Sequence, residues 1–308
     1  MPCDVWHPAR VSTSGTAPAG GPDVVVLSPH LDDAVLSLGA SIARLTATGR
    51  QVQVWTAFTA GPTQQRQPRR WRAFGDYAVR RAEDDRALTI VGASPRHLGL
   101  PERIWREPRP GTLAGAFCGP RTAAGFSCLD ALREAVASAL SAPGVEVFAP
   151  LGIGQHADHL EVAVAAVEAA TQQGGGARLA FYEDYYALSE AFRRQHPVTR
   201  RNPFPPGASP GLAAPGLGIG LRLMAATIRG RRLDDYLPET GSLAWCCEAW
   251  PVDGFEDRKL AAVAAYASQV PRLGGARGLA AALRRAHRVR GGELVWRLAT
   301  AGTTPVGE

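Results

Sequence analysis

The chain carries two short clusters of histidine and aspartate that are far apart in the sequence. The first is PHLDD at residues 29–33, and the second is HADH at residues 156–159; together they offer three imidazole rings and three carboxylates. Imidazole nitrogen and carboxylate oxygen are both good zinc ligands, and a site with three protein ligands keeps a position open for water. These residue types predict a divalent-metal centre that activates water for hydrolysis.

The segments around the clusters indicate how they could meet. The first cluster follows the apolar run Val24 to Leu27, and the second follows the largely apolar residues 145–151. A segment with helical spacing comes after each cluster. In open α/β sheets, ligands bind beyond the carboxyl ends of the strands. We therefore expect both clusters to face one crevice at that edge of a sheet.

The first cluster places Asp32 and Asp33 in the first turn of a predicted helix. The partial positive charge at a helix amino end keeps carboxylates ionised, as a metal ligand or a general base requires. Capping of the helix is the alternative role. A cap needs only one carboxylate, however, and it leaves the position of His30 at the end of a buried strand unexplained.

The second cluster places two histidines three residues apart at a helix start, so both can lie on one face. One of them, His156 or His159, could bind a metal while the other reaches the reacting group. Asp158 could orient an imidazole by accepting its ring proton, as metal and catalytic histidines commonly require. The alternative is a pair of surface histidines near a turn.

Strand-like and helix-like segments alternate along the chain. Strands are expected at residues 23–28, 51–58, 97–100, 145–149, 178–182 and 242–250, and helices at 33–48, 75–91, 129–140, 159–171 and 255–268. This order predicts an α/β, Rossmann-like fold with a largely parallel sheet and helices on both faces. We expect a loose arm at residues 1–22, one domain over 23–308, and a Pro/Gly-rich insertion near 201–220 that forms an irregular flap beside the site.

The composition is that of an ordinary globular protein. The 308 residues are 45% hydrophobic and 20% charged, and the net charge of +6 comes from scattered arginines, since Lys259 is the only lysine. Scattered arginines indicate a solvated surface, and we expect no nucleic-acid partner. The five cysteines show no C-x-x-C spacing, which favours free thiols.

No segment of the sequence has the pattern of a signal peptide or a good membrane span. Residues 1–22 lack an uninterrupted apolar core, and the apolar stretch 212–228 is interrupted by Pro215 and Arg222. We therefore expect a cytoplasmic protein with no membrane partner. The sequence leaves the oligomeric state open.

Together, the motifs resemble those of the LmbE-like, or PIG-L-type, family of zinc-dependent de-N-acetylases. The family's first motif, P-H-P-D-D-E, corresponds here to PHLDDA at residues 29–34, and its second, H-x-D-H, to residues 156–159. Weaker likenesses occur in the family's order at residues 80–83, 98–101, 182–185, 259 and 266–269.

The resemblance implies a role for each residue of the two motifs. Three residues are implied to bind the zinc ion: His30, Asp33 and His159. Asp32 would be the general base that takes a proton from the attacking water and returns it to the leaving amine. His156 would stabilise the oxyanion of the tetrahedral intermediate, and Asp158 would hold His156 in place.

The resemblance further implies hydrolysis of an N-acyl group, an N-acetyl group in the simplest case, from an amino sugar or glycoside. The segment PHLDDAVLS resembles family members of natural-product pathways such as glycopeptide-antibiotic tailoring, although Leu31 and Ala34 replace the usual Pro and Glu. The two-His, one-carboxylate ligand set suits zinc and also iron(II). The alternatives are a metal-dependent hydrolase of another amide or ester, and a non-catalytic Rossmann-like protein that binds a sugar or nucleotide. No G-x-G-x-x-G motif follows the first strand, which argues against a dinucleotide site.

Overall fold

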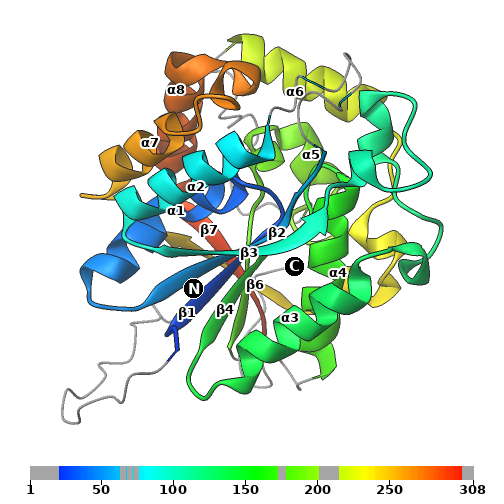
Figure 1. The fold of residues 1–308 in the computed structure, drawn as a ribbon, viewed down its shortest axis with the longest axis horizontal. Helices are drawn as coiled ribbons and strands as arrows, with labels where there is room; N and C mark the ends of the chain where they lie inside the picture. The colour runs from blue at the N-terminus through cyan, green and yellow to red at the C-terminus, as the bar shows by residue number, and fades with distance from the viewer. Residues whose placement is uncertain are drawn as a thin grey trace.

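The computed structural model describes residues 21–62, 67, 72, 76–172, 178–200 and 215–299. Within these residues, seven strands form one sheet in the order β3-β2-β1-β4-β5-β7-β6 (Figure 1). The strands are β1 (Val24–Ser28), β2 (Val52–Ala60), β3 (Ser94–Pro101), β4 (Glu146–Pro150), β5 (Leu179–Tyr182), β6 (Trp245–Trp250) and β7 (Glu293–Leu298). The first five strands pair in parallel, and β7 is antiparallel to both of its neighbours. The predicted α/β fold with a largely parallel sheet is confirmed.

Helices cover both faces of this sheet. They are α1 (Asp33–Ala47), α2 (Tyr77–Val91), α3 (Leu129–Ser141), α4 (Ala157–Gln172), α5 (Glu190–Gln195), α6 (Pro215–Thr227), α7 (Glu256–Ala264) and α8 (Gly275–Arg290). Figure 1 shows α1, α2 and α7 on one face and α3 and α4 on the other. None of the helices in the described part of the chain is both long enough and apolar enough to cross a membrane.

The strand order reverses at β1, which lies between β2 and β4. The chain proceeds outward from β1 through β2 to β3, and then crosses to β4 on the other side of β1. Such a reversal leaves a crevice at the carboxyl ends of the two central strands. The turn after β1 carries the first cluster and the segment after β4 carries the second, so both face this crevice as expected.

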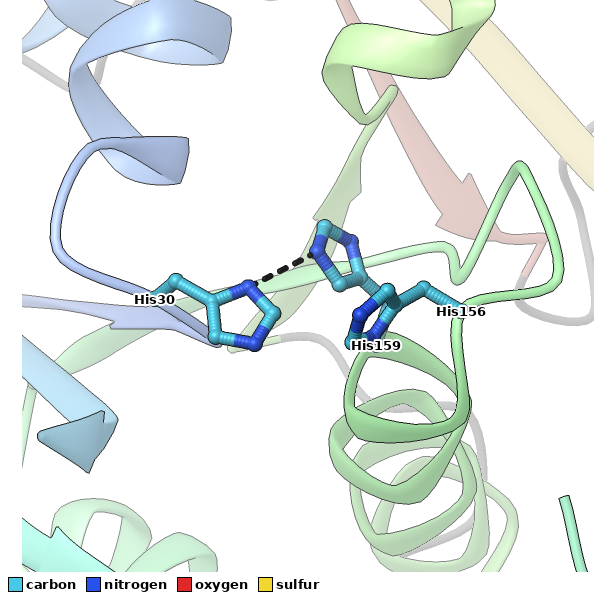
Figure 2. Close-up of side chains that lie close together, drawn as sticks. All are labelled: His30, His156 and His159. Carbon is cyan, nitrogen blue, oxygen red and sulfur yellow. Dashed lines mark hydrogen bonds between the residues drawn. The ribbon is translucent and has the colours of Figure 1, made fainter. Parts of the chain in front are cut away.

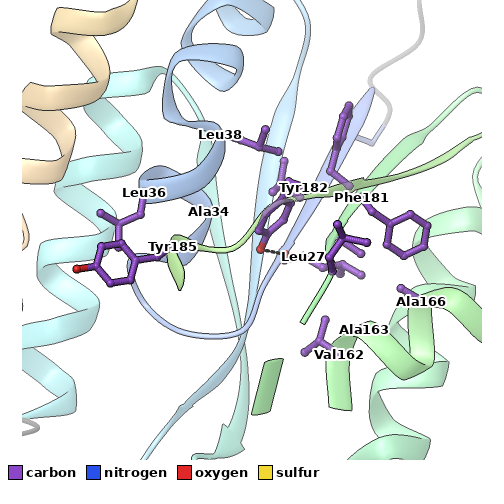
Figure 3. Close-up of a cluster of buried hydrophobic side chains, with 14 of the residues drawn as sticks. Leu27, Ala34, Leu36, Leu38, Val162, Ala163, Ala166, Phe181, Tyr182 and Tyr185 are labelled. Atoms are coloured by element: carbon purple, nitrogen blue, oxygen red, sulfur yellow. Dashed lines mark hydrogen bonds between the residues drawn. The ribbon is translucent and has the colours of Figure 1, made fainter. Parts of the chain in front are cut away.

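The core on either side of β1 fixes the carboxyl end of this strand. All five residues of β1 are buried, as expected for a central parallel strand. Figure 3 shows Leu27 among side chains of β5 and α4, including Phe181, Tyr182 and Ala163. The buried Tyr182 hydroxyl donates a hydrogen bond of 2.8 Å to the carbonyl oxygen of Leu27. This bond ties the end of β5 to the end of β1, where the first cluster begins.

The prediction of an irregular flap at residues 201–220 is wrong where it can be checked. Residues 201–214 lie outside the described residues, as do residues 1–20 of the expected arm. Residues 215–220, however, begin helix α6. Proline is well tolerated in the first turn of a helix, and burial of Leu221 and Ala225 outweighs the poor helix propensity of the glycines. The sequence pattern also did not indicate α8 or β7.

Candidate metal centre

The turn between β1 and α1 is held by its own side chains. The hydroxyl of Ser28 donates to the carbonyl oxygen of His30 (2.7 Å) and accepts the N–H of Ala34 (3.1 Å). The backbone N–H of His30 donates to Oδ2 of Asp33 at 2.9 Å. These bonds turn the carboxylate of Asp33 back toward the ring of His30.

Three side-chain atoms converge in the crevice at nearly equal separations. Oδ2 of Asp33 lies 3.1 Å from Nδ1 of His30 and 3.2 Å from Nε2 of His159. The two ring nitrogens are themselves 3.2 Å apart. Ligands of a tetrahedral zinc ion with bonds of 2.0–2.1 Å are separated by about 3.3 Å. The donor set therefore fits one face of a tetrahedral site.

The outward nitrogens of the same two rings each meet a buried carboxylate. Nε2 of His30 lies 2.9 Å from Oδ2 of Asp158, and Nδ1 of His159 lies 2.5 Å from Oδ1 of Asp184. An ionised carboxylate can only accept, so each outward nitrogen carries a proton, and in the neutral form of each ring the inward nitrogen presents its lone pair. Three acceptors then face one another, an arrangement that favours positive charge among them, either a metal ion or a further proton on each ring.

The electrostatics of the crevice favour positive charge at this point. Burial lowers the pKa of His159, but Asp33 and Asp184 outweigh burial and raise this pKa to about 9. Burial also lowers the pKa of His30, and again the carboxylates around the ring, Asp158 first, raise it well above its usual value. The carboxylates that produce these shifts would equally stabilise a bound metal ion.

His156 lies beside this triangle. Figure 2 shows the three rings together: His30 comes from the turn after β1, while His156 and His159 come from the start of α4. One nitrogen from each ring lies within 4.8 Å of the others, so a set of three histidines could also hold a metal. The contacts of 3.1–3.2 Å, however, join His30, Asp33 and His159, and we take these three as the tighter donor set.

The ring of His156 is arranged to donate a hydrogen bond. Its Nδ1 accepts the backbone N–H of Asp158 at 3.3 Å, which leaves the proton on Nε2. Burial and the nearby rings of His30 and His159 hold the pKa of His156 well below its usual value, although Asp158 opposes them. The ring is therefore neutral, with one N–H to offer.

Asp158 bonds to His30 and not to His156, the partner that the family resemblance implied. Its Oδ2 bonds to Nε2 of His30 and lies 3.9 Å from Nδ1 of His156. Because that Nδ1 already accepts a backbone N–H, it has no proton to give to a carboxylate. Asp158 therefore orients His30, and His156 is held by the backbone of the helix start.

Asp32 stands at the start of α1 without capping it. Its side chain makes no capping hydrogen bond and accepts none from the other described residues. Burial and the charge of Asp33 raise the pKa of Asp32 to about 8, although Arg80 and His30 lower it. A carboxylate with unused oxygens and a pKa near neutrality is suited to accept a proton from water.

Aromatic side chains flank the histidines. The ring of Phe117 lies 5.1 Å from that of His156, and the ring of Tyr186 lies 5.7 Å from that of His159. Gly154 adopts a positive φ of 97°, and a Cβ there would overlap the ring of Tyr186. The glycine thus lets Tyr186 pack against the segment that carries His156.

Several residues around the centre had no predicted role. Asp184 lies in the segment 182–185 that resembles the family, but nothing in the sequence pairs it with His159. Arg106 and the backbone of Arg103 also contact Asp158. Trp245 and Trp250 are buried against Phe181 and Phe148, respectively, and belong to the core.

The fold and this donor set define the class of protein. It is an α/β protein with a centre that fits a divalent metal, located where the strand order of the sheet reverses. The PIG-L family, described as GlcNAc-PI de-N-acetylase, matches residues 25–170, a range that includes both motifs. This match confirms the resemblance that the two motifs carry. No curated protein matches the sequence.

Solved structures of deacetylases have a similar fold. A deacetylase–bog complex from the teicoplanin biosynthesis pathway has a TM-score of 0.62 at 20% identity, covering 91% of this chain and 99% of that chain. The A40926 pseudoaglycone deacetylase Dbv21 has a TM-score of 0.57 at 23% identity, covering 91% and 98%. The zinc-inhibited form of the teicoplanin deacetylase Orf2 has a TM-score of 0.58 at 19% identity, covering 91% and 99%. At these identities the likeness shows the fold.

Proposed function

We propose that this protein is a zinc-dependent N-deacetylase that removes an N-acyl group, in the simplest case acetyl, from an amino sugar or glycoside. The observation that carries the proposal is the triangle of acceptor atoms from His30, Asp33 and His159. Both rings are oriented by buried carboxylates, as metal-binding histidines commonly are. Zinc at this point would supply a Lewis acid and a water that is acidic enough to be activated at neutral pH.

The residues around the triangle supply the proton transfers. Asp32 takes a proton from the attacking water, because its carboxylate has no hydrogen bond to give up among the described residues. His156 donates its Nε2–H to the oxyanion as the amide carbon becomes tetrahedral. Asp32 then returns its proton to the leaving amine. Asp158 keeps the His30 ring in the orientation that the centre requires.

The substrate class follows from the family description, and the fold neighbours indicate which substrates to test first. The family description names a de-N-acetylase of an N-acetylglucosamine glycolipid. The neighbours of similar fold act in the teicoplanin pathway or on the A40926 pseudoaglycone. Ala34 is buried in the core and adds no charge to the crevice where the family's usual motif has Glu. Glycopeptide-type N-acyl glycosides are therefore the first candidates, in a cytoplasmic natural-product pathway.

A metal-dependent deacylation assay tests the proposal. Metal-free protein is supplied with zinc or iron(II) and incubated with N-acetylglucosaminides and with N-acyl glycopeptide pseudoaglycones, and release of the free amine is followed. We expect turnover only with metal. Hydrolysis of esters or other amides alone would favour the second hydrolase hypothesis. Tight binding of a sugar with no turnover under any metal would favour the non-catalytic one.

A further inference from the structure

Behind the centre, the carboxylate of Asp158 has two different partners. The side chain is fully buried. Its Oδ2 accepts from Nε2 of His30 at 2.9 Å and from the backbone N–H of Arg103 at 3.0 Å. Its Oδ1 pairs with Nη2 of Arg106. The direction in which Asp158 holds the His30 ring therefore depends on what binds Oδ1 of Asp158.

Arg106 forms ion pairs with two carboxylates of α4 at once. While Nη2 pairs with Asp158, Nη1 donates to Oε2 of Glu161 at 2.5 Å, three residues further along the same helix. The guanidinium also lies over the ring of Phe58, with Cζ 5.0 Å from the ring centroid. The side chain is only 8% exposed. A planar guanidinium can bridge two carboxylates in this way, whereas a lysine ammonium would be a single point charge.

We propose that Arg106 is a positioning residue for the metal centre, acting through Asp158 on His30. Its fork keeps the two neighbouring carboxylates of α4 from repelling each other. It also fixes Asp158 so that Oδ2 points at Nε2 of His30, which turns Nδ1 of that ring toward Asp33 and His159. The inference rests on the proposed metal-binding role of His30 and extends it to a residue outside both motifs.

The test compares metal affinity in three variants. Arg106→Lys keeps the charge and removes the bridging fork, and we expect zinc affinity, measured by competition with a chromophoric chelator, to fall by about 10–100-fold. Arg133→Lys is the matched control: Arg133 forms a two-bond contact with Glu168 of the same helix, at an exposed position away from the centre. Glu161→Gln removes the charge of the other partner of Arg106, keeps an oxygen that can accept its hydrogen bond, and leaves the contact with Asp158. Both controls should bind zinc as the wild type does.

A second readout reports on the geometry of the ligands. The visible absorption of the cobalt(II)-loaded protein should change in Arg106→Lys and stay unchanged in the two controls. If Arg106→Lys fails to fold, the double variant Arg106→Gln/Glu161→Gln removes one charge of each sign and should show the same loss of affinity.

The outcomes separate this inference from the proposed function. A wild-type protein that binds no metal overturns the proposed function and the inference with it. Metal binding in the wild type with equal affinity in Arg106→Lys and Arg133→Lys overturns the inference alone. If Glu161→Gln weakens zinc binding as much as Arg106→Lys, the effect comes from general packing of α4, and the inference also fails.

Discussion

Two clusters of buried charged side chains contact α1, one at its amino end and one near its middle. At the amino end, Asp33 faces one nitrogen of each of two rings, and the other nitrogen of each ring bonds to a buried carboxylate. Near the middle, Glu293 accepts from the N–H groups of Ala40 (3.0 Å) and Ser41 (2.7 Å) and from Nζ of Lys259 (2.7 Å). The second cluster supplies a donor for each acceptor and needs nothing added. The first brings three acceptor atoms together when both rings are neutral, and a bound metal ion would complete it.

The cluster around Glu293 and Lys259 has a structural role that supports the metal centre. Helix α1 is bent at Leu38, where φ and ψ are −119° and 16°. Such a bend interrupts the regular backbone bonds, and buried N–H groups must then find other partners. Glu293 takes the N–H groups after the bend, and Lys259 donates to the carbonyl oxygen of Ser37 at 3.2 Å before it. The only lysine of the chain thus helps to set the direction of the helical turn that carries Asp33.

Removal of one ligand should distinguish the clusters most sharply. In His159→Ala we expect the metal content to fall from about one ion per chain to near zero, because one of the three donors is lost. The matched control is His287→Ala: His287 contacts Lys259 and Glu256 in the other cluster and should not affect the metal. Elemental analysis of both variants checks this. Equal metal content in His159→Ala and the wild type would remove His159 from the ligand set.

Loss of the proposed base should reduce turnover without releasing the metal. In Asp32→Ala we expect the rate to fall by about 10²–10⁴-fold, the usual contribution of a general base. The metal stays because Asp32 is outside the triangle of donors. Steady-state kinetics together with elemental analysis checks the prediction, and near-normal turnover on the true substrate would show that another group accepts the proton.

Breaking the cluster around Glu293 and Lys259 should lower the stability of the protein and leave its zinc affinity unchanged. Lys259→Met leaves the buried Glu293 without its counter-charge, and such a loss typically costs about 3–5 kcal/mol of unfolding free energy. Denaturant titration of the metal-free protein measures this loss. Zinc affinity in the folded variant should stay within a few-fold of the wild type. A variant as stable as the wild type would mean that the ion pair contributes little beyond its own desolvation.

Truncation of His156 should lower the rate and preserve both metal and substrate affinity. The Nε2–H contacts the oxyanion more strongly in the transition state than in the ground state, so its loss lowers kcat rather than raising KM. We expect His156→Ala to lose about 10²–10³-fold in kcat. Asp158→Asn should act differently, by loosening His30 and weakening metal binding. If His156→Ala itself strips the metal, the set of three histidines is the correct one.

The sequence was enough to predict the donors but not the groups that orient them. The two motifs follow strands whose carboxyl ends must share one edge of a parallel sheet, so their meeting follows from topology alone. The partners Asp184 and Arg106 lie outside both motifs, and their contacts depend on how β5 and the segment before residue 106 pack. Within HADH, adjacency suggested that Asp158 serves His156, whereas the carboxylate reaches across the crevice to His30.

Among the elements of the fold, too, the sequence predicts some directly, whereas others depend on tertiary packing. The parallel strands other than β3 are short, largely apolar runs between helices, and the sequence shows them directly. Strand β7 begins with the charged Glu293 and runs antiparallel, so neither its pattern nor the βα alternation indicates it. Helix α6 contains proline and several glycines, and only burial of one of its faces makes it helical.

The smallest expected effect comes from the fit of Lys259 against α1. Gly39 follows the bend, and a Cβ there would lie 2.8 Å from Cγ of Lys259. Alanine is normally the better helix residue, by up to about 1 kcal/mol. Here the lysine stem is buried and its end is bound to Glu293, so it cannot easily move aside, and overpacking of this kind costs about 1–3 kcal/mol. Gly39→Ala should therefore destabilise the metal-free protein.

Gly220→Ala is the matched control, since Gly220 is an exposed helical position with no atom within 4 Å of an added Cβ, and it should be neutral or stabilising. Thermal unfolding of the two variants decides the matter: equal stabilisation by both would mean that Lys259 can shift and that the cluster does not hold the bend of α1 rigidly.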